Sequence, residues 1–314
     1  MSIETVQRVA VVSTGVIGAS WTTCFLAAGL DVTASDPAPD AEAALRAAVA
    51  AQWPAMAAIG LAAGASPERL RFVASPEAAV AAAQLVQENA PEDLDLKRNL
   101  FRRLSAAAPA DAILASSSST FMVSEFQDAC AHPERVVLGH PFNPPHLIPL
   151  VEVAGGRTTS AAAIERALGF YRAVGKHPIR LRREVRGHIA NRLQAALWQE
   201  ALHLVASGVA SVADIDAAIA HGPGLRWALL GPLLNLHLAG GPGGIAALYE
   251  KPLWQASEAM MRDLGRAAMD AALARQVAAG VVEELHGRGQ DDIVRERDQA
   301  LVALLQLKAA AKLP

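Results

Sequence analysis

The stretch Val-Ala-Val-Val-Ser-Thr-Gly-Val-Ile-Gly, residues 9–18, decides the fold of the N-terminal half of this chain. Its apolar, β-branched beginning is typical of a buried strand, and an alanine-rich stretch typical of a helix follows the glycines. A strand that turns directly into a helix gathers backbone N–H groups at the positive end of the helix dipole, where a phosphate group binds well. We therefore expect a nucleotide-binding α/β unit at the start of the chain.

The turn fits the dinucleotide-binding fingerprint at two of its three glycine positions. Gly15 and Gly18 fill the second and third positions, whereas Ser13 stands where the tight turn prefers glycine. The side chain of Ser13 could strain the turn or crowd the cofactor. The residues expected to contact the cofactor here are Ser13, Gly15, Val16, Ile17 and Gly18.

The next predicted strand ends at Asp36, 18 residues after Gly18. A carboxylate at this place accepts hydrogen bonds from the adenosine ribose hydroxyls and repels a 2′-phosphate. The sequence therefore predicts NAD as the cofactor in preference to NADP. The alternative is an ordinary βαβ unit in which Asp36 is a surface turn residue.

Short β-branched runs alternate with helical stretches up to about residue 181, which predicts a doubly wound, largely parallel sheet. The expected strands are Val9–Val12, Val32–Ser35, Leu70–Val73, Leu85–Gln87, Ala112–Ala115, Val136–Leu138, Leu150–Val153 and Pro178–Leu181. Ser160 and Gly175 have the spacing of helix caps, and Ser211 with Asp214 has that of a capping box. Beyond Glu184 only helical periodicity remains. We expect a Rossmann-type α/β domain over residues 1–185 and an all-α domain over residues 186–314.

Composition excludes several classes of protein. The 314 residues carry a formal net charge of −3 and only 4% aromatic side chains, which argues against nucleic acid as a partner. Two cysteines provide no disulfide framework and no metal-ligand pattern, so no metal is expected. The stretch from Trp227 to Leu248 lacks charges, but its prolines and glycines predict a buried helix–turn segment rather than a membrane span. The polar N-terminus shows no secretory signal, and we expect a cytoplasmic protein.

A histidine and a glutamate flank a proline-rich connection between two predicted strands. His140 opens the sequence His-Pro-Phe-Asn-Pro-Pro, and Glu152 lies in Leu-Val-Glu-Val. Four prolines between them make a stiff connection that can fold back and bring the two side chains together. A carboxylate beside an imidazole fixes its tautomer and stabilises the imidazolium, so the pair can take a proton from an alcohol while hydride leaves for a nicotinamide.

These features together resemble the 3-hydroxyacyl-CoA dehydrogenase family over nearly the whole chain. The matching stretches are Val11–Gly18, Glu88–Lys97, Ala115–Thr120, Gly139–Pro144, Leu150–Val153 and Gly187–Leu193. The resemblance implies an NAD-dependent dehydrogenase that dimerises through its helical domain.

The resemblance also assigns roles to residues of the site. It implies that His140 is the general base and that Glu152 orients it. Ser119 would bind the reacting oxygen, although any of Ser116 to Ser119 could fill this role, and Asn191 would complete the substrate site. Glu92 and Lys97 match residues near the nicotinamide end of the cofactor. The plainer alternatives are a solvated loop for the serines, an interdomain tie for Asn191 and a helix-dipole partner for Glu92.

The sequence of the predicted helical domain indicates the class of substrate. The runs Ala196–Val205 and Gly224–Gly231 resemble the branch of the family that oxidises L-carnitine, while the Leu238–Gly241 region is more loosely similar to the L-gulonate dehydrogenase and lambda-crystallin branch. A carnitine site needs a wall for a cation, for which Trp198 and Trp227 are candidates, with Phe142 or Tyr249 as replacements for either, and Arg226 could meet the carboxylate. The alternative is that both tryptophans pack helices and Arg226 lies at the surface. Other hypotheses are a 3-hydroxybutyryl-CoA dehydrogenase, an L-gulonate 3-dehydrogenase and a non-catalytic NAD-binding protein.

Overall fold

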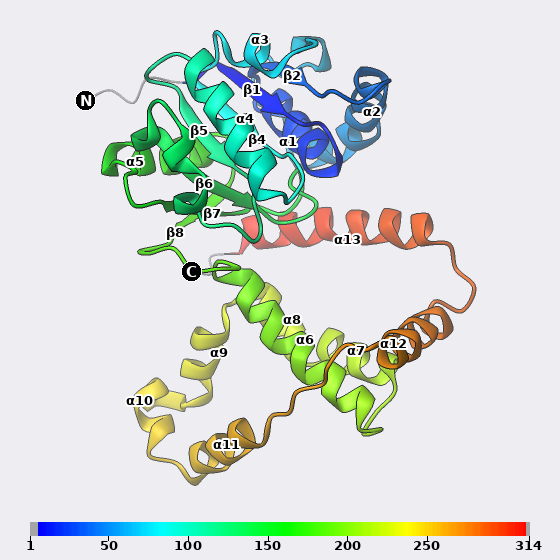
Figure 1. Cartoon of the computed structure of the whole chain (residues 1–314). Helices are drawn as coiled ribbons and strands as arrows, with labels where there is room; N and C mark the ends of the chain where they lie inside the picture. The colour runs from blue at the N-terminus through cyan, green and yellow to red at the C-terminus, as the bar shows by residue number, and fades with distance from the viewer. Residues whose placement is uncertain (1–5, 312–314) are drawn as a thin grey trace. The chain divides into compact units, whose positions relative to one another are not determined.

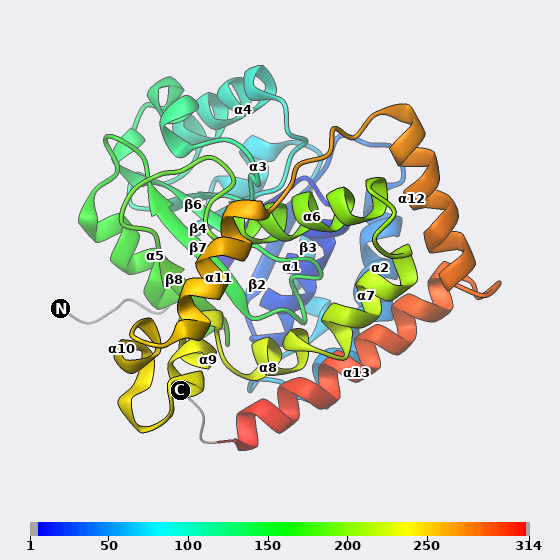
Figure 2. The same cartoon turned by 90° about the horizontal axis from the view of Figure 1, so that it is seen from below.

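The computed structural model describes residues 6–311, and the contacts between residues divide the chain into two compact units. The first unit ends at Arg192 and the second begins at Leu193. A single eight-stranded sheet with helices on both faces forms the first unit (Figure 1). Every element described in the second unit is a helix (Figure 2).

The sheet has the strand order β3-β2-β1-β4-β5-β6-β7-β8. All neighbouring strands are parallel except β6 and β7, which pair antiparallel. Each strand overlaps one of the runs expected from the sequence, so the predicted doubly wound sheet is confirmed. The strands are β1 (Arg8–Val12), β2 (Asp31–Ser35), β3 (Leu70–Phe72), β4 (Leu85–Glu88), β5 (Ile113–Ser116), β6 (Val136–Pro141), β7 (Leu150–Gly155) and β8 (His177–Arg180).

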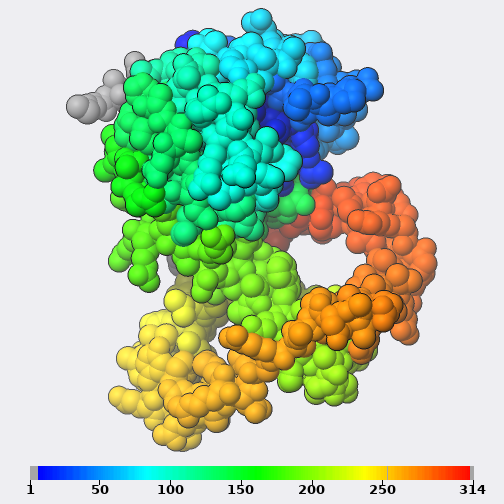
Figure 3. Space-filling model, in the orientation of Figure 1, coloured from blue at the N-terminus to red at the C-terminus, as the bar shows by residue number. Residues whose placement is uncertain are grey.

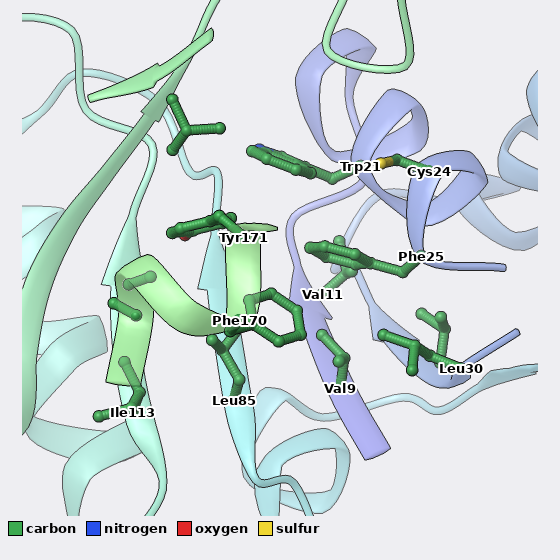
Figure 4. Close-up of a cluster of buried hydrophobic side chains, with 14 of the residues drawn as sticks. Val9, Val11, Trp21, Cys24, Phe25, Leu30, Leu85, Ile113, Phe170 and Tyr171 are labelled. Atoms are coloured by element: carbon green, nitrogen blue, oxygen red, sulfur yellow. The ribbon is translucent and has the colours of Figure 1, made fainter. Parts of the chain in front are cut away.

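Two apolar layers bury the two faces of the sheet. The helices α1 (Val16–Ala27), α2 (Ala41–Ile59) and α5 (Ala161–Ala173) cover one face, and α3 (Pro76–Val80) and α4 (Leu94–Ala107) cover the other. On the first face the Trp21 ring stacks on that of Phe25, with 5.0 Å between the ring centroids. The centroid of the Tyr171 ring lies 5.6 Å from that of Trp21 (Figure 4). Short 3-10 turns complete this unit at Pro67–Arg69, Val123–Glu125, Gln127–Ala129 and Pro133–Arg135.

A glycine in β6 allows this core to close. A Cβ on Gly139 would lie 1.9 Å from the hydroxyl oxygen of Tyr171, so only glycine fits. That hydroxyl donates to Gln87 Oε1 (2.6 Å), and Gln87 Nε2 donates to the carbonyl of Gly139 (3.1 Å). The bonds tie α5, β4 and β6 together where β6 leads to His140.

The second unit continues α6 (Ala190–Ala206), which starts in the first. Ser211 caps α7 (Val212–Ala220) as expected, since its hydroxyl accepts the N–H of Asp214. Helix α12 (Ala271–Glu284) packs on α7 (Figure 3). The remaining elements are α8 (Pro223–Leu229), α9 (Pro232–Ala239), a 3-10 turn at Gly241–Gly243, α10 (Gly244–Tyr249), α11 (Pro252–Asp263) and α13 (Gln290–Ala310).

The segment Trp227–Leu248 forms helices and turns as expected, but in the single chain the prediction that it is buried holds only for Gly240, Gly244 and Leu248. Neither α8 nor α9 has a buried residue, and Leu233 is 73% exposed. Apolar periodicity predicts which face of a helix is apolar. It does not predict whether another part of the same chain packs against that face.

Neither cysteine forms a disulfide. Cys24, on α1, lies in the apolar layer on the first face of the sheet. Cys130 is buried in the apolar layer on the other face, beside α4. Burial raises the pKa of the Cys130 thiol to about 11. Within residues 6–311, no helix is long and apolar enough to cross a membrane.

Candidate active site

The turn between β1 and α1 has the geometry of a phosphate-binding turn. Ser13 adopts a left-handed backbone (φ +67°), the conformation for which the fingerprint prefers glycine. A Cβ on Gly18 would lie 2.0 Å from the carbonyl oxygen of Ser13, so glycine is required there. A Cβ on Gly15 would meet no atom within 4 Å, which leaves open space at the N-terminus of α1. These residues fit a pyrophosphate group held against the first amides of the helix.

Asp36 closes on this turn from the end of β2. Its Oδ2 accepts the N–H of Thr14 (2.7 Å), and its Oδ1 accepts the N–H of Ala38 (2.8 Å). The carboxylate therefore lies beside the phosphate-binding turn, where the ribose of a dinucleotide would lie.

Two acidic residues organise the ends of β4 and β5. Glu88 is completely buried and pairs with Lys97, whose Nζ lies 2.9 Å from Glu88 Oε1 and 3.0 Å from the carbonyl of Ala90. Lys97 is thus a buried tie between β4 and α4, and its contact with the cofactor stays a prediction. Glu92 accepts the hydroxyl of Ser118 (2.8 Å) and the N–H of Ser119 (2.5 Å).

The four serines after β5 have different partners. Ser116 donates to Glu88 (2.6 Å), Ser117 to Asn89 (2.7 Å) and Ser118 to Glu92. The hydroxyl of Ser119 lies 3.1 Å from His140 Nε2. Of the alternatives that the sequence left open, Ser119 is therefore the serine that faces the imidazole.

His140 and Glu152 are direct partners across the antiparallel β6–β7 ladder. Both side chains are buried, and His140 Nδ1 lies 2.9 Å from Glu152 Oε2. Because a carboxylate oxygen accepts, Nδ1 carries the hydrogen, and Nε2 of the neutral ring is left to accept the Ser119 hydroxyl. The proline-rich connection therefore does fold back and bring the two side chains together.

The second oxygen of Glu152 holds the start of α6. Oε1 accepts the N–H groups of Ile189 (2.8 Å) and Ala190 (3.0 Å). Burial works to raise the pKa of Glu152, but the hydrogen bonds from His140 and from these two amides outweigh burial and hold the pKa below its ordinary value. The glutamate therefore stays ionised beside the imidazole. Asn191, one residue further along, points its amide at the carbonyl of Ser119 (3.5 Å).

His188, to which no sequence motif assigns a role, lies in the middle of this group. Its ring centroid is 4.9 Å from that of His140, and its Nε2 donates to the carbonyl of Ser118 (2.9 Å). Burial lowers its pKa, and the neighbouring His140 lowers it further. His188 also has left-handed backbone (φ +52°), which no local sequence pattern announces.

The candidate substrate residues, which are aromatic side chains and Arg226, are divided between the two units. The Phe142 ring is edge-on to that of His140, with 5.2 Å between the ring centroids, and belongs to the first unit. Trp198 is in the second unit, where it lines an apolar cavity of about 320 Å³ between α6, α7 and α12. Arg226 and Trp227 are exposed on α8. Within residues 6–311, no cluster of histidine, cysteine and acidic side chains has the arrangement of a metal site.

The sequence matches a known family over both units. Residues 8–185 match the family described as 3-hydroxyacyl-CoA dehydrogenase, NAD binding domain, and residues 187–284 match the C-terminal domain of the same family. An L-carnitine dehydrogenase of Streptomyces griseus is 52% identical over 317 residues, which cover 99% of this chain and 92% of that protein. An L-carnitine dehydrogenase of Pseudomonas aeruginosa is 47% identical and covers 96% and 94%.

Solved structures agree in fold. A 5-formyl-3-hydroxy-2-methylpyridine 4-carboxylic acid 5-dehydrogenase, described as an NAD⁺-dependent dismutase, superimposes with a TM-score of 0.85 at 26% identity, covering 98% of this chain and 100% of that chain. A 3-hydroxybutyryl-CoA dehydrogenase from Escherichia coli gives a TM-score of 0.64 at 31% identity, covering 74% of this chain and 49% of that one.

Proposed function

Since this chain belongs to the 3-hydroxyacyl-CoA dehydrogenase family and is an NAD-dependent dehydrogenase, we propose that it oxidises the 3-hydroxyl of L-carnitine to the ketone. The choice of L-carnitine as the substrate rests on sequence identity. About half of all positions are identical to those of L-carnitine dehydrogenases over nearly their full length. L-gulonate, 3-hydroxybutyrate and 3-hydroxybutyryl-CoA are the competing substrates.

In this proposal His140 is the general base. Its Nε2 takes the proton of the substrate hydroxyl, and the Ser119 hydroxyl, 3.1 Å from Nε2, binds the same oxygen. Glu152 holds Nδ1–H at 2.9 Å and stabilises the imidazolium that forms. When bound at the turn before α1, NAD supplies the acceptor for the hydride that leaves the carbinol carbon.

The remaining candidates have supporting roles in this proposal. Asn191 orients the substrate beside Ser119, and Glu92 fixes the serine loop through Ser118 and Ser119. Phe142 closes one side of the His140 ring. Trp198 and Trp227 remain the proposed partners of the trimethylammonium group, and Arg226 the partner of the carboxylate.

We also propose that the enzyme is a cytoplasmic homodimer joined by its helical units. Many large apolar side chains of the second unit are exposed in the single chain, among them Leu233, Val282 and Leu307. Exposed apolar side chains in such number support an interface with a second copy of the chain. Two buried, free cysteines suit a reducing compartment.

The decisive experiment combines a substrate panel with variants of the imidazole–carboxylate pair. L-carnitine should give the highest kcat/KM with NAD among the four substrates. His140→Ala should lower kcat by about 10²–10⁴-fold, the usual contribution of a general base, while NADH affinity stays within about twofold. Glu152→Gln should keep the fold and some activity but move the pH–rate profile, since an amide holds the ring without stabilising its charge.

Two results would count against the proposal. A folded His140→Ala protein that oxidises its substrate at the wild-type rate would remove the mechanism. A panel in which L-gulonate or the CoA thioester is the best substrate would keep the mechanism and replace the substrate. Parallel losses of melting temperature, NADH affinity and turnover in both variants would indicate a structural role for the pair.

A further inference from the structure

Lys176 is a buried lysine for which the proposed mechanism has no use. It directly precedes β8, and only 9% of its surface is exposed. It takes part in none of the ion pairs found among residues 6–311. A buried ammonium without a carboxylate is costly unless other groups satisfy its hydrogens, so the partners of Lys176 indicate what it does.

Those partners belong to the connection between β6 and β7, residues 142–149. Lys176 Nζ donates to the carbonyl of Pro145 and to the carbonyl of Ile148 (3.3 Å). The ammonium also lies 5.5 Å from the ring centroid of Trp21, whose face attracts a cation. Two loop carbonyls and one aromatic ring thus replace the missing carboxylate.

This connection makes some backbone hydrogen bonds of its own: the carbonyl of Pro144 accepts the N–H groups of Leu147 (3.0 Å) and Ile148 (2.9 Å). Its prolines have no N–H to donate to the other carbonyls around them. Two side chains from outside the connection supply further bonds. One is Lys176, and the other is Ser20 of α1, whose hydroxyl accepts the N–H of His146 (2.8 Å) and lies 2.6 Å from its Nδ1.

We propose that Lys176 is a positioning residue that fixes the 142–149 connection and thereby holds Phe142 edge-on against the His140 ring. The connection leaves β6 after Pro141, one residue beyond His140, and returns in β7 at Leu150, two residues before Glu152. Freeing its middle lets Phe142 withdraw, and the imidazole then loses one of the two rings packed against it, the other being that of His188. The inference rests on the proposed role of His140 as general base for its kinetic part only.

The test uses the full-length chain with Lys176→Met, which keeps the length of the side chain and removes the ammonium. Arg180→Met is the matched control, since Arg180 lies on β8 and makes only an exposed ion pair with Glu165. Hydrogen exchange should become at least tenfold faster in peptides covering residues 142–149 of Lys176→Met and stay unchanged in peptides covering β1 and α1. The kcat should fall at least fivefold while NADH affinity stays within about twofold, and Arg180→Met should match the wild type in every measurement.

Unchanged exchange in residues 142–149 of a folded Lys176→Met protein would overturn the proposal, as would a kcat within twofold of wild type. If Lys176→Met does not fold, Lys176→Gln decides, because its amide can serve one of the two carbonyls and should give a smaller increase in exchange and a smaller loss of kcat. A Gln variant with wild-type exchange and kcat overturns the proposal too. If His140→Ala retains activity, the kcat measurements on Lys176→Met lose their meaning together with the proposed function. The hydrogen-exchange measurements still test whether Lys176 fixes residues 142–149.

Discussion

Asp36 shows how a single side chain can serve both the fold and the choice of cofactor. Its two oxygens accept the N–H groups of Thr14 and Ala38, so the carboxylate shapes the turn and brings a negative charge to it. The hydrogen bonds need only an acceptor, whereas rejection of a 2′-phosphate needs the charge. The two contributions can therefore be separated by substitution.

We expect kcat/KM with NAD to exceed that with NADP at least tenfold, which corresponds to about 1.4 kcal/mol. Asp36→Asn keeps an acceptor for Thr14 and removes the charge, so the ratio should narrow. Steady-state kinetics with both cofactors measure the ratio, and Asp40→Asn, an exposed position before α2, serves as the control. Equal rates with the two cofactors in the wild type would show that Asp36 does not select.

His188 makes the stability of the protein depend on pH. Burial holds its pKa in the folded state below the value of about 6.5 in the unfolded chain. Between these two values the unfolded chain binds a proton that the folded chain does not, so the free energy of unfolding falls as the pH drops. The stabilisation is complete above about pH 6.5 and is lost as the pH falls through the folded-state value.

The wild-type melting temperature should therefore fall more between about pH 7.5 and pH 5 than that of His188→Phe, which keeps a ring and cannot take up a proton. Thermal unfolding followed by circular dichroism at several pH values measures this difference. His177→Phe, at an exposed histidine of β8, should keep the wild-type dependence. Parallel curves for the wild type and His188→Phe would mean that another group is responsible.

At the scale of the element, the turn between β1 and α1 explains both the fit and the misfit of the fingerprint. The carbonyl of Ser13 excludes any side chain at Gly18, and the left-handed backbone of Ser13 is the conformation that makes this close approach possible. A non-glycine residue in this conformation costs about 1–2 kcal/mol. The turn therefore carries strain that a glycine would relieve.

Ser13→Gly should leave the melting temperature unchanged or raise it, because the relief of strain offsets the greater freedom of glycine in the unfolded chain. NADH affinity, followed by fluorescence, should be unchanged or tighter. Ser13→Val should lower the melting temperature, since a β-branched side chain tolerates left-handed backbone least. Weaker NADH binding by a stable Ser13→Gly protein would show that the serine hydroxyl itself contacts the cofactor.

The elements of the first unit could be predicted because their signals are local. Each strand follows from a β-branched run. Ser160 caps α5 as its place before the predicted helix indicates, and its hydroxyl accepts the N–H of Ala163 three residues later. The pairing of His140 with Glu152 could be predicted from the proline-rich connection between them, whereas the place of Ser119 and Asn191 in the candidate site followed only from the family resemblance. His188 and Lys176 were missed because their roles depend on left-handed backbone and on carbonyl groups distant in the sequence, which no periodicity records.

At the scale of the whole molecule, the second unit exposes many large apolar side chains in the single chain. Leu193 and Leu197 follow the helical period of α6 and remain exposed. The cavity between α6, α7 and α12 is lined almost entirely by apolar side chains. A second copy of the chain is the partner that would cover such surfaces in a homodimer.

Light scattering during gel filtration should therefore give a mass twice that of the 32.8 kDa chain. Val281→Glu places a charge in the apolar cavity on α12 and should shift the protein toward monomer. Arg275→Glu, exposed on the same helix, should remain dimeric. A wild-type chain that is monomeric at micromolar concentration would contradict the proposed assembly.

The antiparallel ladder between β6 and β7 has a consequence for how this scaffold tolerates insertions. His140 and Glu152 face each other because the strands are in register, and the connection between them is a separate stretch of chain. Residues added to that connection could reshape the rim of the site and leave the imidazole opposite its carboxylate. One residue added inside either strand would turn the following side chains to the other face of the sheet and part the two groups. The pairing of His140 with Glu152 is therefore compatible with a change in the length of the connection and incompatible with a change in the length of either strand.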